Sequence, residues 1–161
     1  MKITLSILKA DVGSIGGHTK PSDHMINAVR MAADEAIKSG LLIDVFVGHT
    51  GDDICMTTSH TNGPNNTDVH QFAWNTFLKA TDIAREYGLY GAGQDLLVDA
   101  PSGNVRGAGP AVAEIEFEHT LEKPRAAESF MVFAADKCGP GAYNLPLFQG
   151  FADPMFCGGL M

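Results

Sequence analysis

Two adjacent carboxylates, Asp52 and Asp53, follow an apolar run at positions 41–48 of the sequence. The same pattern occurs earlier in the chain, where a strand-like segment ends on Asp11 and a glycine-rich turn then leads to His18. Adjacent carboxylates repel each other, and a bound divalent cation offsets that repulsion. Oxygen ligands and one imidazole, carried by the loops after two strands, therefore indicate a metal site and metal-dependent phosphate chemistry.

Two further polar residues join this candidate metal site. Gln94 lies in a glycine-rich loop and Asp136 follows a predicted strand, so both side chains can reach a cleft. Carboxylate and amide oxygens suit Mg²⁺, or Mn²⁺, better than zinc. Each residue alone has an ordinary alternative. The carboxylate pair also fits a turn that binds backbone amides, His18 a structural histidine, and Gln94 a polar loop residue.

An α+β fold is predicted to position these residues. Two helices are expected, one that Ser22 caps and Gly40 ends, and one over about 68–87 that Thr67 or Asp68 caps. Short connections favour a largely antiparallel sheet with both helices on one face, and the chain is taken as a single domain, 1–161. Strands are predicted at residues 3–10, 41–47, 54–61, 111–117 and 130–135, and apolar and polar residues alternate in the first and fourth of them. No regular element is predicted over 138–161.

Composition limits the partners. The formal net charge of -8 argues against nucleic acid, and no apolar stretch is long enough for a membrane span. The sequence runs from Met1 into a strand pattern without a signal-peptide layout, and its 3 cysteines show no paired spacing. The simplest interpretation is a reduced, cytoplasmic compartment. Metal ions would reconcile an acidic site with a phosphorylated substrate. Most of the glutamates at positions 114–128 are expected to be solvated surface.

Several longer segments occur in a characteristic order: ADVGSIGGHTKPS, GLLIDVFVGHTGDDI, GLYGAGQDLLVDAPSGNVRG, FMVFAADK and NLPLFQGFADPM. Over nearly its whole length the chain thereby resembles the archaeal-type fructose-1,6-bisphosphate aldolase/phosphatase family, a bifunctional, magnesium-dependent family of gluconeogenesis. The resemblance implies a four-layer α-β-β-α sandwich, with fructose 1,6-bisphosphate and triose phosphates as substrates. Family members are much longer, and the match is to their N-terminal part.

The resemblance also assigns roles to residues. Asp11 resembles the family's proton acceptor for the attacking water. The lysine that forms the aldolase Schiff base, and its tyrosine partner, belong to a later part of the family sequence, so no residue here takes those roles. Six positions match family magnesium ligands: Asp11, His18, Asp52, Asp53, Gln94 and Asp136. The residues expected to contact the sugar bisphosphate are His18, Tyr90, Ser102, Gly103, Asn104 and Lys137.

Three interpretations stay open from the sequence. The chain is the N-terminal part of such an enzyme, alone or paired with a separate C-terminal half; or it is a short magnesium phosphatase for another sugar phosphate; or it is a non-catalytic metal-binding remnant or oligomerising subunit. The segments 41–47 and 130–135 are apolar on both faces, and two helices cover only one face of a sheet. A homo-oligomer formed by sheet-on-sheet packing is therefore expected.

Overall fold

The structure, a computed structural model, describes residues 1–96, 110–118, 132, 134–136, 141, 143–153 and 155. The chain divides into two units, residues 1–127 and 128–161, and the single-domain assignment stays a prediction. The first unit contains β1 (Lys2–Asp11), α1 (Asp23–Lys38), β2 (Asp44–Thr50), β3 (Asp53–His60), α2 (Thr67–Glu86), the 3₁₀ helix η1 (Gln94–Leu96) and β4 (Ala111–Glu118). The second contains α3 (Asn144–Phe151). No helix in the described part of the chain has both the length and the apolarity that crossing a membrane requires.

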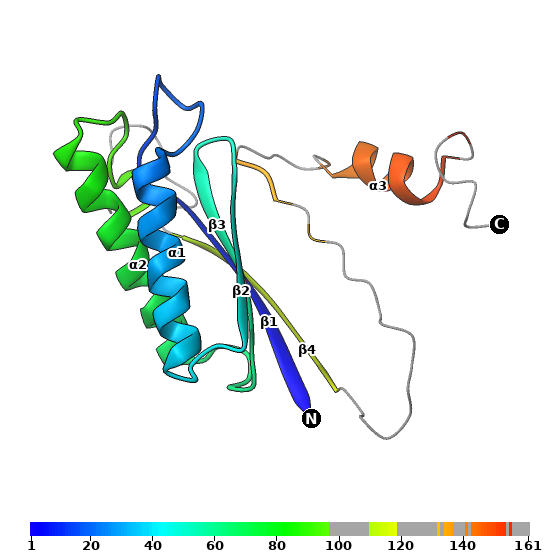
Figure 1. The fold of residues 1–161 in the computed structure, drawn as a ribbon. Coiled ribbons are helices and arrows are strands. Elements are labelled where there is room, and N and C mark those ends of the chain that lie inside the picture. Colours follow the sequence, from blue (N-terminus) through cyan, green and yellow to red (C-terminus); the bar gives the residue numbers. More distant parts are fainter. Residues whose placement is uncertain are drawn as a thin grey trace. The chain divides into compact units, whose positions relative to one another are not determined.

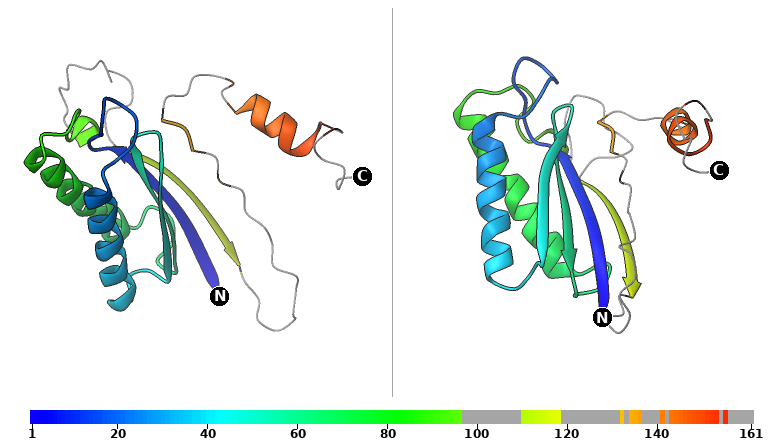
Figure 2. Two further views of the ribbon diagram at one scale, coloured as in Figure 1. Left: turned by 45° about the horizontal axis from the view of Figure 1, so that its top comes forward. Right: turned by 45° about the vertical axis from the view of Figure 1, so that its right-hand side comes forward.

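The four strands form one sheet in the order β2-β3-β1-β4, and every neighbouring pair is antiparallel. Helices α1 and α2 lie side by side on one face of this sheet in all three views (Figures 1 and 2). The predicted α+β class, the antiparallel pairing and the placement of both helices are thus confirmed. The register aligns Asp11 on β1 with Asp53 on β3, so two of the candidate ligands are direct cross-strand neighbours.

The helix ends follow the expected capping chemistry, with one difference. The Ser22 hydroxyl accepts a hydrogen bond from the Met25 amide at 3.3 Å, and Gly40 follows the last turn with a φ of 79°. For α2, the predicted caps Thr67 and Asp68 are wrong, because the Asn66 side chain accepts from two amides of the first turn. An asparagine one residue earlier reaches those amides without entering the helix.

Three other predictions need correction. The strand expected at 41–47 begins only at Asp44, because the amides of Leu41 and Leu42 bond to the Ala36 carbonyl and close helix α1. No strand occurs at the described residues of 130–135, which are 132, 134 and 135. Helix α3 lies in the segment expected to be irregular. It carries no charged residue and buries none of its side chains, so it lacks the amphipathic period that predicts a helix.

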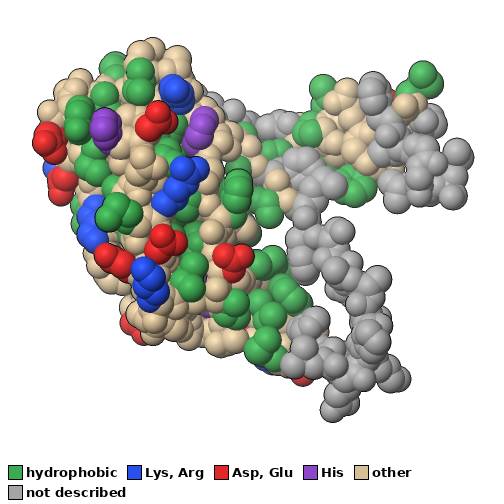
Figure 3. Space-filling view, in the orientation of Figure 1, with side chains coloured by type: hydrophobic (Ala, Val, Ile, Leu, Met, Phe, Trp, Pro, Cys, Tyr) green, Lys and Arg blue, Asp and Glu red, His purple; other side chains and the backbone are tan. Residues whose placement is uncertain are grey.

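The core of the first unit lies between the two helices and the sheet. It joins Leu8 and Ala10 of β1 to Phe77 of α2 and Met25 of α1, all within 1% of complete burial. Alternation along β1 turns the even-numbered residues toward this core, and the odd-numbered residues toward the opposite face. Figure 3 shows the outer helical side, where acidic and basic side chains are interspersed as on an ordinary solvated surface.

The sheet face opposite the helices carries exposed apolar side chains. Phe46 on β2 is 72% exposed and Ile115 on β4 is 49% exposed. The strand register places these side chains on the face that carries the odd-numbered residues of β1, Ile3, Leu5 and Ile7. Among the described residues of the first unit, no helix or second sheet packs on this side, so these side chains form an exposed apolar surface.

Glu114 of β4 ties this edge strand to the helical layer. Its Oε1 accepts hydrogen bonds from the Ser6 hydroxyl at 2.7 Å and from His70 Nε2 of α2 at 2.9 Å, and its Oε2 accepts from the Asn65 amide at 2.7 Å. The Glu114 side chain is only 9% exposed, so its assignment to solvated surface is wrong. The register with Ser6 of β1 turns it inward.

We expect Gly13→Ala to destabilise the fold strongly. Gly13 has a φ of 140°, and an added Cβ would lie 2.5 Å from the Ala84 Cβ of α2. Strain and overpacking together should cost roughly 3 kcal/mol or more. Gly40→Ala is the matched control, since Gly40 has a φ of 79° but no atom within 4 Å of its added Cβ, and it should cost only about 1 kcal/mol. Urea unfolding of both variants measures the difference, and equal losses would contradict the steric argument.

Candidate metal centre

Three loops meet at the end of the sheet where β1 finishes: the β1–α1 loop, the β2–β3 turn and the loop that follows α2 (Figure 1, top). Two backbone hydrogen bonds join the first loop to the third, from the Ser14 amide to the Tyr90 carbonyl at 2.9 Å and back at 3.1 Å. A third runs from the Gly93 amide to the Val12 carbonyl at 3.0 Å. These bonds fix the two loops against each other.

Asp11, His18 and Asp52 converge at this end. Their potential ligand atoms all lie within 4.8 Å of one another. His18 Nδ1 lies 2.8 Å from Asp52 Oδ2 and 3.8 Å from Asp11 Oδ2. Both aspartates are buried, at 3% and 0% exposure, whereas the His18 side chain is 35% exposed. The cluster thus combines two enclosed carboxylates with a partly exposed imidazole.

Local backbone chemistry places these side chains. Asp52 occupies a two-residue turn between β2 and β3, and its neighbour Gly51 supplies the φ of 57° that such a tight turn needs. His18 itself has a φ of 50°, a left-handed conformation that is uncommon for a residue with a side chain. Asp53 begins β3 opposite Asp11, and its Oδ2 accepts an ion-paired hydrogen bond from Lys9 Nζ.

The electrostatics favour a cation. Among the described residues, neither carboxylate oxygen of Asp11 accepts a hydrogen bond, and the same holds for Oδ1 of Asp52. Burial, followed by repulsion from the carboxylates of Asp52, Asp53 and Asp95, raises the pKa of Asp11 to about 7, although His18 lowers it in part. Buried carboxylates without donors are costly, and a divalent cation supplies the missing charge. The oxygen-rich ligand set fits Mg²⁺ or Mn²⁺.

The structure also places Tyr90 and Gln94. The Tyr90 ring contacts the His18 ring edge to face, with centroids 4.8 Å apart, so an expected substrate contact lies beside the cluster. Gln94 is half-buried in η1. Its side chain lies close to Gly91, since a Cβ added at Gly91 would be 3.0 Å from Gln94 Oε1. Asp136 belongs to the second unit, residues 128–161. The substrate contacts expected at Ser102, Gly103, Asn104 and Lys137 lie outside the described residues. All of these roles stay predictions.

Two residues of the site were missed by the sequence interpretation. Asp95 is the next residue after Gln94, and its Oδ2 accepts a hydrogen bond from the Asp11 amide at 2.8 Å. Lys9 holds Asp53 from the neighbouring strand. The available signal was a second carboxylate in the glycine-rich loop, and for Lys9 the strand alternation that puts it on the same side as Asp11.

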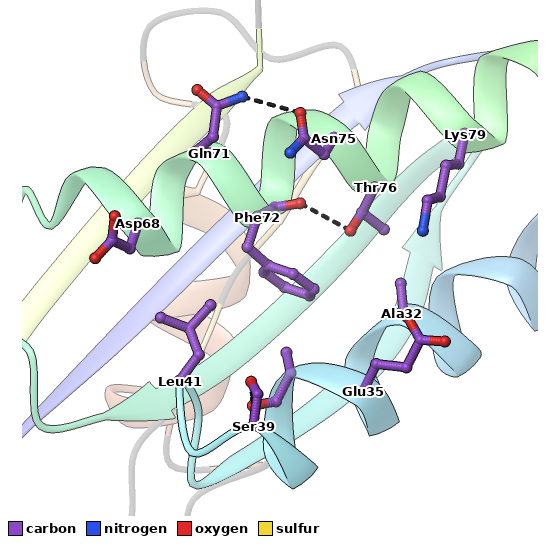
Figure 4. Close-up of a pocket in the computed structure, with 11 residues that line it drawn as sticks. Ala32, Glu35, Ser39, Leu41, Asp68, Gln71, Phe72, Asn75, Thr76 and Lys79 are labelled. Atoms are coloured by element: carbon purple, nitrogen blue, oxygen red, sulfur yellow. Dashed lines mark hydrogen bonds between the residues drawn. The ribbon is translucent and has the colours of Figure 1, made fainter.

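A groove of about 450 Å³ between α1 and α2 lies away from these carboxylates (Figure 4). Phe72 forms part of its wall, and Glu35 and Lys79 come from the two helices that flank it. Two of its polar side chains bond within α2: Gln71 Nε2 donates to Asn75 Oδ1 at 2.9 Å, and Thr76 donates to the Phe72 carbonyl at 2.8 Å. This helical groove shows no convergence of groups comparable to that of the metal centre.

Comparison with known proteins fits this geometry. A family model described as fructose-1,6-bisphosphatase matches residues 2–161. The chain belongs to this family. Among curated proteins, the chain is 55% identical to the fructose-1,6-bisphosphate aldolase/phosphatase of Thermus thermophilus, over 100% of this chain and 43% of that protein. It is 52% identical to the protein of the same name from Cenarchaeum symbiosum, over 100% of this chain and 41% of that protein.

A third relative, from Pyrobaculum neutrophilum, is 51% identical and is covered over 39% of its length. The chain therefore spans about two fifths of the length of the curated relatives that it matches. The resemblance noted from the sequence motifs is confirmed, including its restriction to part of the relatives. Within the fructose-1,6-bisphosphatase family, the described cluster gives this chain an acidic centre of the type that binds divalent metal.

Proposed function

We propose that this chain contributes the N-terminal part of a magnesium-dependent phosphatase that hydrolyses the 1-phosphate of fructose 1,6-bisphosphate in gluconeogenesis. The observation that carries the proposal is the buried cluster of Asp11, Asp52 and His18 in a family member. Such a cluster is expensive to bury without a cation, yet the strand ends and a tight turn hold it in place. A structural role alone would not require two buried carboxylates and an imidazole to converge at one strand end.

Each residue has a role that its surroundings support. When bound, Mg²⁺ neutralises charge on phosphate oxygens and activates water. Asp11 is proposed as the general base that accepts a proton from the attacking water, because its carboxylate is buried in the cluster and accepts no hydrogen bond from the described residues. Asp52 orients His18 through its 2.8 Å contact, and Tyr90 packs against the imidazole. Asp53, Gln94 and Asp136 are proposed as further ligands, and Ser102, Gly103, Asn104 and Lys137 as contacts to the sugar bisphosphate.

The proposal extends to architecture. The uncovered apolar sheet face supports the four-layer α-β-β-α sandwich, in which a second sheet packs on this face. That second sheet would come from a separate C-terminal part or from another copy. Aldolase chemistry on triose phosphates is assigned to that C-terminal part, because no residue here takes the role of the Schiff-base lysine. The buried free thiol of Cys55 supports a reducing, cytoplasmic setting.

A chimaera tests the proposal. This chain replaces the matching stretch of the Thermus thermophilus relative, and phosphate release from fructose 1,6-bisphosphate is measured. We expect release that requires Mg²⁺, stops with a chelator, and falls at least about 100-fold in Asp52→Asn, because the residue that orients His18 and faces the cation loses its charge. Asp34→Asn, at an exposed position of α1, is the matched control and should keep full activity. A folded chimaera that binds Mg²⁺ but releases no phosphate would contradict the proposed reaction.

A further inference from the structure

The side chain of Lys9 forms an ion pair within the candidate metal centre. It lies near the end of β1, two residues before Asp11, and its side chain is only 17% exposed. Its Nζ donates to Oδ2 of Asp53, whose side chain is 2% exposed. Register places Lys9 opposite Cys55, so the contact with Asp53 is diagonal across the β1–β3 pair. Both side chains belong to the sheet face that points away from the helices.

This ion pair differs from an ordinary surface pair on the same strand. Lys2, at the other end of β1, pairs with Glu116 at 3.1 Å, but those side chains are 67% and 30% exposed. Exposed pairs of that kind contribute little, whereas an enclosed lysine beside a buried carboxylate is costly to desolvate unless the two are held together. The burial of Lys9 therefore means that Asp53 has a fixed partner at one of its oxygens.

We propose that Lys9 is a positioning residue that makes the centre prefer Mg²⁺ over Ca²⁺. The proposal rests on the metal-dependent function given above. With Oδ2 held by the ammonium, Asp53 presents a metal ion with a single oxygen. Mg²⁺ demands a small, near-octahedral shell of single oxygens, whereas Ca²⁺ readily takes both oxygens of a carboxylate in a larger shell. Lys9 thus blocks the two-oxygen binding mode that would favour Ca²⁺.

A second consequence concerns charge. Within the first unit, the described residues of the centre include four carboxylates, those of Asp11, Asp52, Asp53 and Asp95, together with Lys9 and the imidazole of His18. Affinity for hard cations rises with the number of uncompensated carboxylates, and the choice between Ca²⁺ and Mg²⁺ depends on the size and flexibility of the site. One carboxylate that is already paired and fixed gives a less charged, more rigid site, which penalises the larger ion more than the smaller one.

Metal titrations of the purified chain test this role without relying on activity. After chelator treatment, the melting temperature is followed against MgCl₂ and against CaCl₂ for wild type, Lys9→Gln and Lys2→Gln. We expect the ratio of the Ca²⁺ midpoint to the Mg²⁺ midpoint to fall about tenfold in Lys9→Gln, a size typical of residues that orient metal ligands. Lys2→Gln removes a lysine from the same strand and should leave the ratio unchanged. Lys9→Arg keeps the positive charge and should retain the wild-type order of the metals.

The outcomes separate the two proposals. If wild type responds to Mg²⁺ but Lys9→Gln keeps the same ratio, Lys9 is only a structural ion pair and the inference is wrong. If the melting temperature of wild type changes with neither metal, the proposed metal centre is wrong, and so is the inference about Lys9. If Lys9→Gln is unfolded without metal, the concentrations of Mg²⁺ and Ca²⁺ that restore its circular dichroism give the same ratio. An unchanged ratio in that format overturns the inference equally.

Discussion

Asp11→Asn is expected to raise the melting temperature of the metal-free protein and to abolish its response to Mg²⁺. The Asp11 carboxylate is 3% exposed and faces the charges of Asp52, Asp53 and Asp95. An asparagine removes this repulsion, and its amide can donate to the neighbouring carboxylates. Since each unit of pKa shift corresponds to about 1.4 kcal/mol, the gain at pH 8 should be a few kcal/mol, or roughly 5–10 °C.

The same shift fixes the pH dependence. The unfolded chain releases the Asp11 proton near 3.8, whereas the folded, metal-free protein keeps it up to about 7. Below the unfolded pKa this group imposes no penalty, and its destabilising effect grows as the pH rises through this window and is complete above the folded pKa. Wild type should therefore lose stability relative to Asp11→Asn between pH 4 and pH 7, two values that bracket this window. Saturating Mg²⁺ should reverse the order of the two proteins at pH 8.

Thermal melts at pH 5 and pH 8, with chelator or with millimolar Mg²⁺, make the measurement. Asp34→Asn, on the exposed side of α1, is the control and should melt like wild type in all four buffers. If Asp11→Asn melted lower than wild type in chelator at pH 8, the Asp11 carboxylate would have a stabilising partner in the metal-free protein. The predicted repulsion on Asp11 would then be wrong. A Mg²⁺ shift of the same size in both proteins would remove Asp11 from the ligand set.

The 161-residue chain should self-associate through the sheet face that lacks helices. Phe46 is 72% exposed and Ile115 is 49% exposed, and the register adds Ile3, Leu5 and Ile7 to the same face. Soluble monomers rarely leave a continuous apolar surface of this kind in water. A second copy that packs sheet on sheet would cover it and would rebuild the two central layers of a sandwich. Light scattering at micromolar concentration should report a dimer or a larger closed oligomer.

The double variant Phe46→Ser/Ile115→Ser should shift this equilibrium toward monomer by at least about tenfold in dissociation constant, since two large apolar side chains leave the interface. Met31→Ser is the matched control, because Met31 is 65% exposed but lies on helix α1. A wild-type monomer that binds no apolar dye would show that this face is covered within one chain. The same association in the double variant and in wild type would place the interface elsewhere.

The sequence by itself determined the secondary structure of the first unit to within a few residues. Alternating apolar positions predicted β1 and β4, and the spacing of Ile26, Val29, Ala33 and Ile37 predicted α1, because these periods follow directly from strand and helix geometry. The positions after the strands indicated Asp11 and Asp52 as candidate ligands, because strand ends are where polar side chains can leave the core. The sequence motifs also indicated the family, and the family model matches residues 2–161, which include those motifs.

Only the tertiary structure decided which groups meet. The roles of Lys9, Asp95 and Glu114 depend on partners 44, 84 and 108 residues away, so the local sequence does not indicate which groups they meet. Strand register places Lys9 diagonally across from Asp53, and η1 brings Asp95 to the Asp11 amide. Burial is likewise a property of the assembled layers: Asp52 in a turn becomes fully enclosed, while Phe46 inside an apolar run remains in the open. Local periodicity predicts the secondary structure of a segment, whereas contacts between distant segments determine the partners and the burial of its side chains.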